Sequence, residues 1–139
     1  MKKMVDKRGI LQYNIVEYCI ARYLKGGFTM IPSQMLKGVL EGCILEIIRK
    51  QETYAYEISK QLEKYGFGVI SEGTIYPIIL RLQKNELVKA NLQDSNSGPK
   101  RKYYHLTEKG INTLNRFKDN WQEVNHAVNQ LLMEGIDNE

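Results

Sequence analysis

Cysteine is scarce in this sequence. Cys19 and Cys43 are the two cysteines, and they lie far apart in apolar surroundings without a spacing typical of metal ligands. A reduced, cytoplasmic chain therefore fits better than a disulfide framework. The two histidines, His105 and His126, are isolated from each other and from any cysteine pair. We therefore expect neither a metal site nor a cofactor.

Long apolar runs and catalytic residue sets are also missing. No stretch of about 18 uncharged apolar residues exists, which argues against a membrane span. The sequence has no nucleophile with a base and an orienting group, no paired carboxylates and no phosphate-binding loop. The glycines at positions 66, 68 and 98 lie in expected turns and lack the surrounding residues of such a loop. We therefore expect that the protein is not an enzyme.

What the sequence does contain is positive charge in particular places. The net charge is +4, but residues 1–29 hold six of the 20 Lys/Arg and two of the 16 Asp/Glu, so the rest is neutral. Within that rest, residues 81–102 carry six basic and two acidic side chains, whereas residues 107–139 carry three basic and six acidic ones. A basic segment in a neutral domain is a nucleic-acid signal.

Residues 1–29 fit poorly with the remainder and form an N-terminal extension. Residues 10–24 are apolar nearly all round, so a packed helix is one interpretation; a secretory signal is another, although charges interrupt the run and no small-residue cleavage site follows. We favour a third. Residues 25–27 can be encoded by AAA-GGA-GGN, a bacterial ribosome-binding sequence, and Met30 follows two codons later. This spacing predicts translation initiation at Met30, with residues 1–29 as a translated leader.

The stretch 54–87 organises the chain, because it has the pattern of two short helices joined by a turn. In the first helix Ile58, Leu62 and Tyr65 recur at helical spacing and are expected to pack inward. The glycines at 66 and 68 are expected to end it. In the second helix the inward stripe is Ile75, Ile79 and Leu82. Its other faces suit a DNA major groove or an ordinary solvated surface; they carry Thr74, Tyr76, Arg81 and Lys84.

Pro77 leaves the start of the second helix open. If Thr74 is the N-cap, Pro77 lies in the first turn, where its missing N–H has no consequence. If the helix begins at Ser71, a distortion near Gly73 is expected.

The neighbouring segments complete a recognisable order of elements. Residues 36–50 are expected to form one continuous core helix with the apolar face Leu36, Val39, Leu40, Cys43, Ile44, Ile47 and Ile48. Residues 87–92 and 100–106, around the loop 94–99, predict a hairpin on which one of Tyr103 and Tyr104 is core and the other exposed. Its returning arm places Lys100, Arg101 and Lys102 where they can reach phosphates. The fold class is thus mainly α with a small β-hairpin, a winged helix-turn-helix.

A long C-terminal helix is expected to begin after Thr107. Its apolar residues step by three or four through a seam close to a heptad, namely Ile111, Leu114, Phe117, Trp121, Val124, Val128 and Leu131. From Thr107 to Met133 the helix would be roughly 40 Å long, more than a domain of this size can cover. We therefore predict a homodimer formed by this helix; the alternative is a helix folded back on its own domain.

Residues 31–132 resemble the PadR family of bacterial transcriptional regulators, in particular its members with a short C-terminus. The resemblance rests on Ser71–Pro77 with Arg81-Leu82, on Gly98–Tyr104, and on Leu106–Gly110. Met30-Ile31-Pro32 and Met35-Leu36 also resemble the start of the short members. One departure is Ala55, where the family often has glycine; it puts no function in doubt.

The resemblance implies a dimeric repressor of a pseudo-palindromic operator in double-stranded DNA. From the residues themselves, our candidates for base or phosphate contacts are Thr74, Tyr76, Arg81 and Lys84, and Lys100, Arg101 and Lys102 are expected to contact phosphates. Trp121 matches the position of a tryptophan in the multidrug-binding members of the family. In those proteins the tryptophans of the two subunits hold a flat aromatic ligand between them. The resemblance therefore predicts that such a ligand relieves repression. Plain interface packing of Phe117, Trp121, Val124 and Val128 is the alternative role for these residues.

The sequence therefore predicts three regions: the extension 1–29, a DNA-binding domain 30–106, and a dimerisation helix with its tail, 107–139. The rival interpretation is a winged-helix module that binds another protein without specific DNA binding. The basic segment 81–102 argues for DNA.

Overall fold

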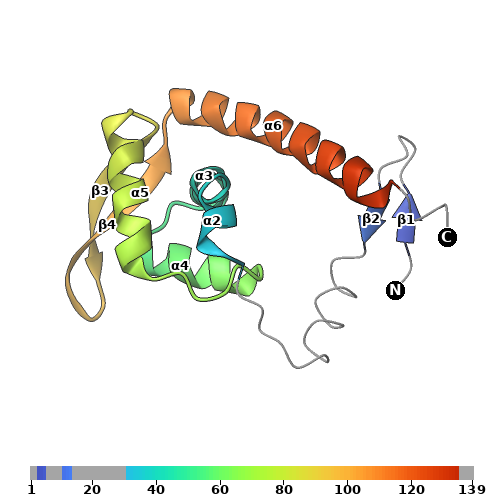
Figure 1. Ribbon diagram of the computed structural model, residues 1–139. Helices are drawn as coiled ribbons and strands as arrows, with labels where there is room; N and C mark the ends of the chain where they lie inside the picture. Colours follow the sequence, from blue (N-terminus) through green and yellow to red (C-terminus); the bar gives the residue numbers. More distant parts are fainter. Residues whose placement is uncertain (1–2, 6–10, 14–30, 135–139) are drawn as a thin grey trace. The chain divides into compact units, whose positions relative to one another are not determined.

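The computed structural model describes residues 3–5, 11–13 and 31–134 (Figure 1). The chain divides into two compact units, one of residues 29–117 and the other of residues 1–28 together with 118–139. Its elements, in order, are β1 (Lys3–Val5), β2 (Leu11–Tyr13), α2 (Ser33–Leu36), α3 (Leu40–Lys50), α4 (Ala55–Lys64), α5 (Glu72–Lys84), β3 (Val88–Ser95), β4 (Gly98–Leu106) and α6 (Glu108–Met133).

Of the N-terminal extension, the structure describes a short antiparallel pair in which Met4 of β1 lies opposite Gln12 of β2. The rest of the segment that we interpret as a translated leader lies outside the described residues.

The core of the unit 29–117 is built from the apolar faces of α3, α4 and α5. Each helix repeats its buried residues at steps of three or four, and each buried side chain of this kind contributes roughly 1.5–3 kcal/mol to folding. The buried side chains of these helices, to which the buried Gly42 of α3 adds only backbone, are Leu40, Ile44, Leu45 and Ile48; Ala55, Ile58 and Leu62; and Ile75, Ile79 and Leu82. The inward stripes predicted for α4 and α5 are thus confirmed, apart from one tyrosine.

That tyrosine is Tyr65, for which the inward prediction was wrong. Its side chain is 58% exposed, and it follows α4 as the C-cap residue. Its ring faces water and the Lys50 ammonium, whose Nζ lies 5.2 Å from the ring centroid. Ile70, at the end of the turn that follows, is buried in the core. This turn contains Gly66 and Gly68 with positive φ values of 94° and 80°, as the sequence predicted.

The single helix predicted over residues 36–50 was also wrong. The structure has α2 ending at Leu36 and α3 beginning at Leu40, with a turn between them. Gly38 lies at the centre of this turn, and glycine costs about 1 kcal/mol more than alanine in a helix interior. The break still allows Leu36 and Leu40 to enter the same core.

The start of α5 follows the second of the two alternatives. Ser71 is the N-cap residue and Glu72 the first helical residue, so Pro77 lies inside the helix. Thr74 is therefore not the N-cap; its hydroxyl lies 3.2 Å from that of Ser71. The residue four positions before Pro77, toward which a proline ring is directed in a helix, is Gly73.

The predicted hairpin is confirmed, with longer strands than the sequence indicated. β3 and β4 pair antiparallel with Ala90 opposite Tyr104, and an irregularity in the register lies between Gln93 and Ser95. Tyr104 is the core residue of the expected pair, whereas Tyr103 is half-buried and not exposed as expected, because its ring packs on Tyr54. Thr53 forms an isolated bridge to Tyr104, which attaches the hairpin to the segment before α4.

The last helix, α6, starts at a side-chain cap. The Thr107 hydroxyl accepts a hydrogen bond of 3.0 Å from the Gly110 N–H and donates one of 2.7 Å to the Glu86 carbonyl.

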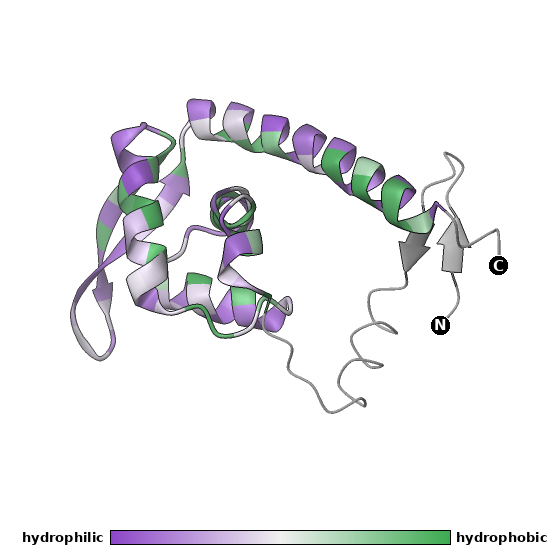
Figure 2. Cartoon of the chain, in the orientation of Figure 1, coloured by the Kyte–Doolittle hydropathy of each residue, from purple (hydrophilic) through white to green (hydrophobic). Residues whose placement is uncertain are grey.

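At 26 residues the helix α6 is roughly 39 Å long, and its C-terminal turns are largely hydrophobic in colour (Figure 2). No helix in the described part of the chain has the length and apolar character required to cross a membrane. Helices α4 and α5 with the β3–β4 wing form a winged helix-turn-helix, as predicted.

Candidate nucleic-acid interface

Helix α5 has an exposed side opposite its buried stripe. Gly73, Pro77, Leu80 and Lys84 step by four, three and four residues along this side, and all four are exposed. Leu80 is 62% exposed. This side of α5 faces away from the core and is free to meet a partner.

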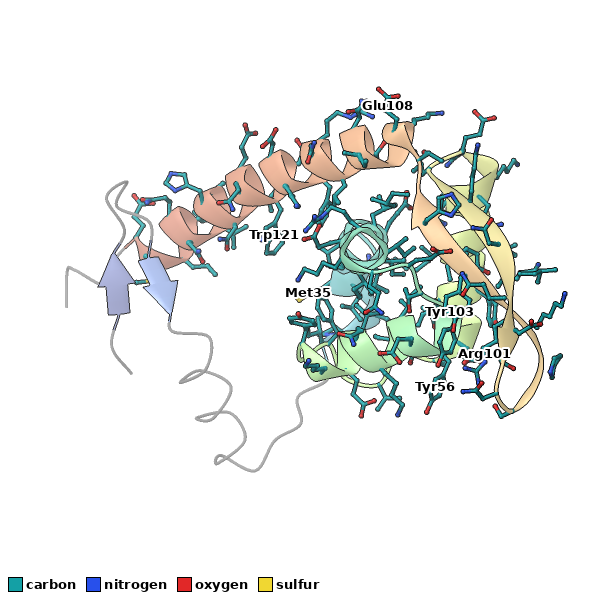
Figure 3. The ribbon with its side chains drawn as sticks, turned by 180° about the vertical axis from the view of Figure 1, so that it is seen from behind. Met35, Tyr56, Arg101, Tyr103, Glu108 and Trp121 are labelled. Atoms are coloured by element: carbon teal, nitrogen blue, oxygen red, sulfur yellow. The ribbon has the colours of Figure 1, made fainter. Side chains whose placement is uncertain are left out.

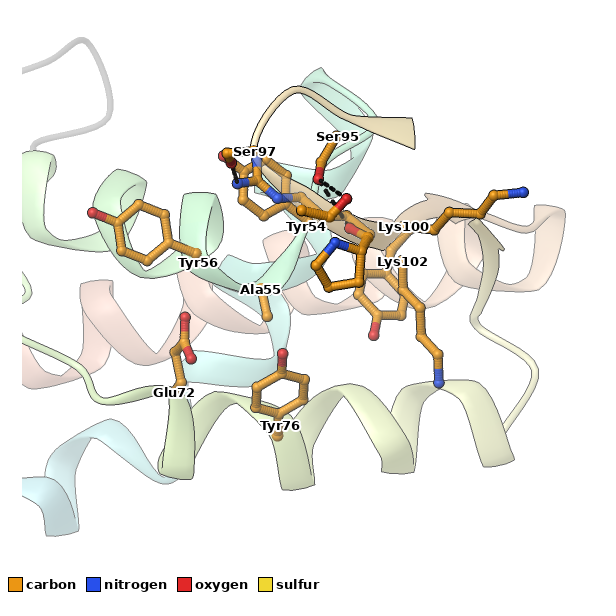
Figure 4. A pocket seen from close by; sticks show the side chains of 13 residues that line it. Tyr54, Ala55, Tyr56, Glu72, Tyr76, Ser95, Ser97, Lys100 and Lys102 are labelled. Atoms are coloured by element: carbon orange, nitrogen blue, oxygen red, sulfur yellow. Dashed lines mark hydrogen bonds between the residues drawn. The ribbon is translucent and has the colours of Figure 1, made fainter. Parts of the chain in front are cut away.

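One flank of α5 faces the wing across a pocket of about 510 Å³ (Figure 4). Tyr76 and Glu72 line it from α5, and Tyr54 and Tyr56 line it from the start of α4. The wing contributes its tip and the beginning of β4, with Lys102 directed toward α5. The pocket thus joins phenol groups to cationic side chains beside the exposed side of α5.

Burial raises the pKa of the Tyr104 phenol, and the nearby Tyr76 raises it further. Tyr104 therefore remains a neutral phenol well above physiological pH. The pocket keeps hydrogen-bond donors and positive charge, which are the groups that contact phosphate oxygens in protein–DNA interfaces. No group of three or more His, Cys, Asp or Glu that could hold a metal ion occurs within residues 3–5, 11–13 and 31–134.

The three basic residues of the wing have different surroundings. Lys100 and Lys102 are exposed, whereas Arg101 is half-buried. The Arg101 guanidinium lies 4.6 Å from the centroid of the Tyr54 ring and donates a hydrogen bond of 3.4 Å to the Ser97 hydroxyl. Figure 3 labels Arg101 and Tyr103, which lie on β4, and Tyr56, which lies on α4. Arg101 thus holds the wing tip to the start of α4, and the two lysines extend from it.

The opposite flank of α5 carries Arg81, which makes an ion pair with Glu41 of α3. Its Nη2 and Nε lie 2.9 and 3.1 Å from Glu41 Oε2. Contact between Arg81 and DNA would have to compete with this pair. The sequence predicted Arg81 among the DNA contacts, but gave no indication of a partner 40 positions away.

The attachment of the wing involves residues that the sequence analysis did not single out. The Glu52 carboxylate accepts hydrogen bonds from Asn91 and Gln93 on β3, at 3.4 and 3.1 Å. Tyr54 packs its ring 5.2 Å from that of Tyr103. A polar and an aromatic residue just before a helix are common in proteins, so no local signal marks these two as supports of the wing.

Comparison with known proteins agrees with this architecture. The family model described as "Transcriptional regulator PadR-like family" matches residues 44–116. A crystal structure of a PadR-like transcriptional regulator from Bacillus cereus strain ATCC 14579 is 56% identical, covers 71% of this chain and 96% of that chain, and has a TM-score of 0.66. This chain belongs to the PadR-like family. The PadR-like proteins are transcriptional regulators and not enzymes.

Two further proteins are similar to this PadR-like chain. A Lysinibacillus sphaericus protein, named "Uncharacterized protein X", is 34% identical over 110 residues, which are 78% of this chain and 100% of that protein. Bacillus subtilis PadR, solved in complex with operator DNA, is 24% identical and covers 59% of this chain and 47% of that chain, with a TM-score of 0.53. The latter similarity concerns the fold alone.

The residues predicted for the dimer or ligand site of this PadR-like regulator fall into two groups. Phe117 packs against α3, where a Cβ added to Gly42 would lie 2.3 Å from its ring. Trp121, Val124 and Val128 are 45%, 54% and 47% exposed, and they continue the apolar stripe along α6. Phe117 thus supports its own domain, while the other three are accessible.

Proposed function

We propose that this PadR-like protein is a cytoplasmic, homodimeric repressor that binds a pseudo-palindromic DNA operator. The observation that carries the proposal is the exposed side of α5 beside a wing with two exposed lysines. A helix of this kind fits the major groove, and lysines at its edge reach the flanking phosphates. Two such domains related by a two-fold axis would read two half-sites.

The dimer is supported by the apolar stripe of α6. Trp121, Val124, Val128, Leu131 and Leu132 are 45–71% exposed on consecutive turns. Monomeric proteins rarely expose contiguous apolar surface of this kind. A second copy of the same helix is a natural cover for it, because most homo-oligomers have two-fold symmetry.

We further propose that a flat aromatic ligand relieves repression by stacking between the two Trp121 side chains. The exposed indole on an apolar stripe supports this role, since aromatic rings stack favourably on each other. Such a ligand would favour a dimer whose α5 helices are wrongly spaced for the operator. A tenfold shift in the population requires about 1.4 kcal/mol of preference for that state.

DNA binding is tested with the full chain and DNA from upstream of its own gene, with competitor DNA, at two salt concentrations. We expect saturable binding at one dimer per operator. The Lys100→Gln/Lys102→Gln variant should make the negative slope of log K against log salt shallower by roughly 3.6, or 0.9 for each of four lost phosphate contacts per dimer. Lys37→Gln/Lys64→Gln removes the same charge from exposed positions outside the pocket and should leave the slope unchanged.

The result separates the two candidate functions. If competitor abolishes binding to every DNA, or if no DNA binds at either salt concentration, the protein-interaction module is the better description.

The ligand is tested by fluorescence, because Trp121 is the one tryptophan of the chain. A flat aromatic dye should quench its emission and release the operator. With Trp121→Phe the release should need a higher dye concentration, while operator binding without dye is retained. Release that is unaffected by this substitution would contradict the role of Trp121.

A further inference from the structure

The exposed side of α5 is unusually poor in polar side chains. Of its four residues, Gly73, Pro77 and Leu80 have no side-chain hydrogen-bonding atom, and only Lys84, at the C-terminal end, has one. Arginine, asparagine and glutamine are absent from this side of the helix, and Lys84, at its C-terminal end, is the one residue there that can form paired hydrogen bonds with a base.

Two of the polar residues on the flanks of α5 have partners within the domain, and a third faces the wing. Tyr76 lines the pocket toward the wing, and Arg81 is paired with Glu41 at 2.9 Å. The Thr74 hydroxyl lies 3.2 Å from that of Ser71. The surface most directly available to base edges is therefore the apolar pair Pro77 and Leu80.

The major groove offers one apolar group at base edges, the 5-methyl group of thymine. We propose that Pro77 and Leu80 read thymine methyl groups, so that Leu80 is a specificity-determining residue of this regulator. This inference rests on the proposed DNA-binding function. Gly73 assists because the absence of a side chain lets the first turn of α5 approach the bases; a Cβ there would meet only the Ser71 hydroxyl, at 3.7 Å.

The charge around this apolar pair favours DNA over a protein partner. Lys84 continues the same side of α5, and Lys100 and Lys102 extend from the neighbouring wing, all exposed. Cations at one end and along one flank of an apolar strip suit a groove whose bases are bordered by phosphate backbones. The spacing of contacts also fits, since residues 77 and 80 lie within one turn of a helix and can reach adjacent base pairs.

The test removes the methyl group alone. The full-length protein selects its preferred sequence from a random DNA library, and each thymine of that sequence is then replaced by deoxyuridine, which lacks the methyl group. We expect at least one thymine per half-site at which the replacement weakens binding about fourfold, the value of one buried methyl group.

A double-mutant cycle then assigns the contact. In Leu80→Ala the uracil effect at that position should fall below about twofold, because the methyl group has lost its partner. Met35→Ala, which shortens another exposed apolar side chain, 69% exposed on α2, should keep the fourfold effect. Circular dichroism verifies that both variants fold.

Three results would overturn the inference. If the library yields a specific sequence but no thymine is sensitive to uracil, thymine reading is wrong while DNA binding stands. If the fourfold effect persists in Leu80→Ala, another residue reads the methyl group. If no sequence is enriched at all, the proposed function fails as well, and the exposed Leu80 then belongs to a surface for a protein.

Discussion

Replacing Gly42 by alanine should destabilise the protein, although alanine normally stabilises a helix. Gly42 lies in α3 directly beneath the ring of Phe117 from α6. An added Cβ would lie 2.3 Å from two ring carbons and 2.5 Å from a third. These atoms belong to the base of the ring as well as its sides, so the side chain cannot avoid the methyl group by a small rotation.

Two opposing terms set the expected magnitude. Overpacking of this kind costs about 1–3 kcal/mol, whereas exchanging glycine for alanine in a helix gains up to about 1 kcal/mol. The net loss should therefore be about 1 kcal/mol. Without the Phe117 ring the clash disappears, and Gly42→Ala should then stabilise the protein by up to about 1 kcal/mol.

The assay is urea unfolding of the full chain, followed by far-UV circular dichroism at one fixed protein concentration, because a dimer's stability depends on concentration. The four proteins of the cycle are the parent, Gly42→Ala, Phe117→Ala and the double variant. We expect a coupling free energy of about 2 kcal/mol between the two positions.

A matched glycine serves as the control. Gly38 has open space where a side chain would lie, with no atom within 4 Å of an added Cβ, and its φ is not positive. Gly38→Ala should therefore be neutral or stabilising. If Gly42→Ala behaves like Gly38→Ala, or has the same effect with and without the Phe117 ring, then the packing of α6 on α3 is not as described.

Three further outcomes follow from single positions. Gly110→Ala should cost about 3 kcal/mol in urea unfolding, because its Cβ would lie 2.1 Å from the Leu87 carbonyl oxygen, which is backbone and cannot move aside; a loss below about 1 kcal/mol would contradict this. Thr107→Ala should cost roughly 1–2 kcal/mol by removing the cap of α6, and Thr107→Ser should retain most of it. Burial raises the pKa of the Cys43 thiol, so in a Cys19→Ser background a disulfide reagent at pH 8 should react slowly with the native protein and rapidly after unfolding; equal rates would refute the burial.

The parts of the fold that the sequence predicted are those with local signals. The stripe of Ile75, Ile79 and Leu82 has the period of a helix, and all three are buried. The loop before Pro99 gave the hairpin, and Thr107 gave the start of α6. In each case, residues within a few positions of one another were sufficient to determine the local structure.

The features that the sequence did not predict have conflicting local signals or depend on residues far apart in the chain. The break between α2 and α3 interrupts an apolar period that continues unbroken through it. Tyr65 has the spacing of a core residue but prefers to leave its hydroxyl in water. The function of Arg101 was expected to be phosphate binding, and only the position of Tyr54 reveals that it also holds the wing.

Helix α3 and the segment after it contact α5, the beginning of α6 and the wing, and so connect the parts of the domain. Two adjacent residues of α3 connect to different helices: Glu41 pairs with Arg81 of α5, and Gly42 receives Phe117 of α6. The segment after α3 holds the wing through Glu52. The helix that we propose to enter the groove is thus oriented against the same short stretch as the base of the helix that we propose to form the dimer. A change in the packing of Phe117 on Gly42 would therefore act directly beside Glu41, whose ion pair with Arg81 joins α3 to α5.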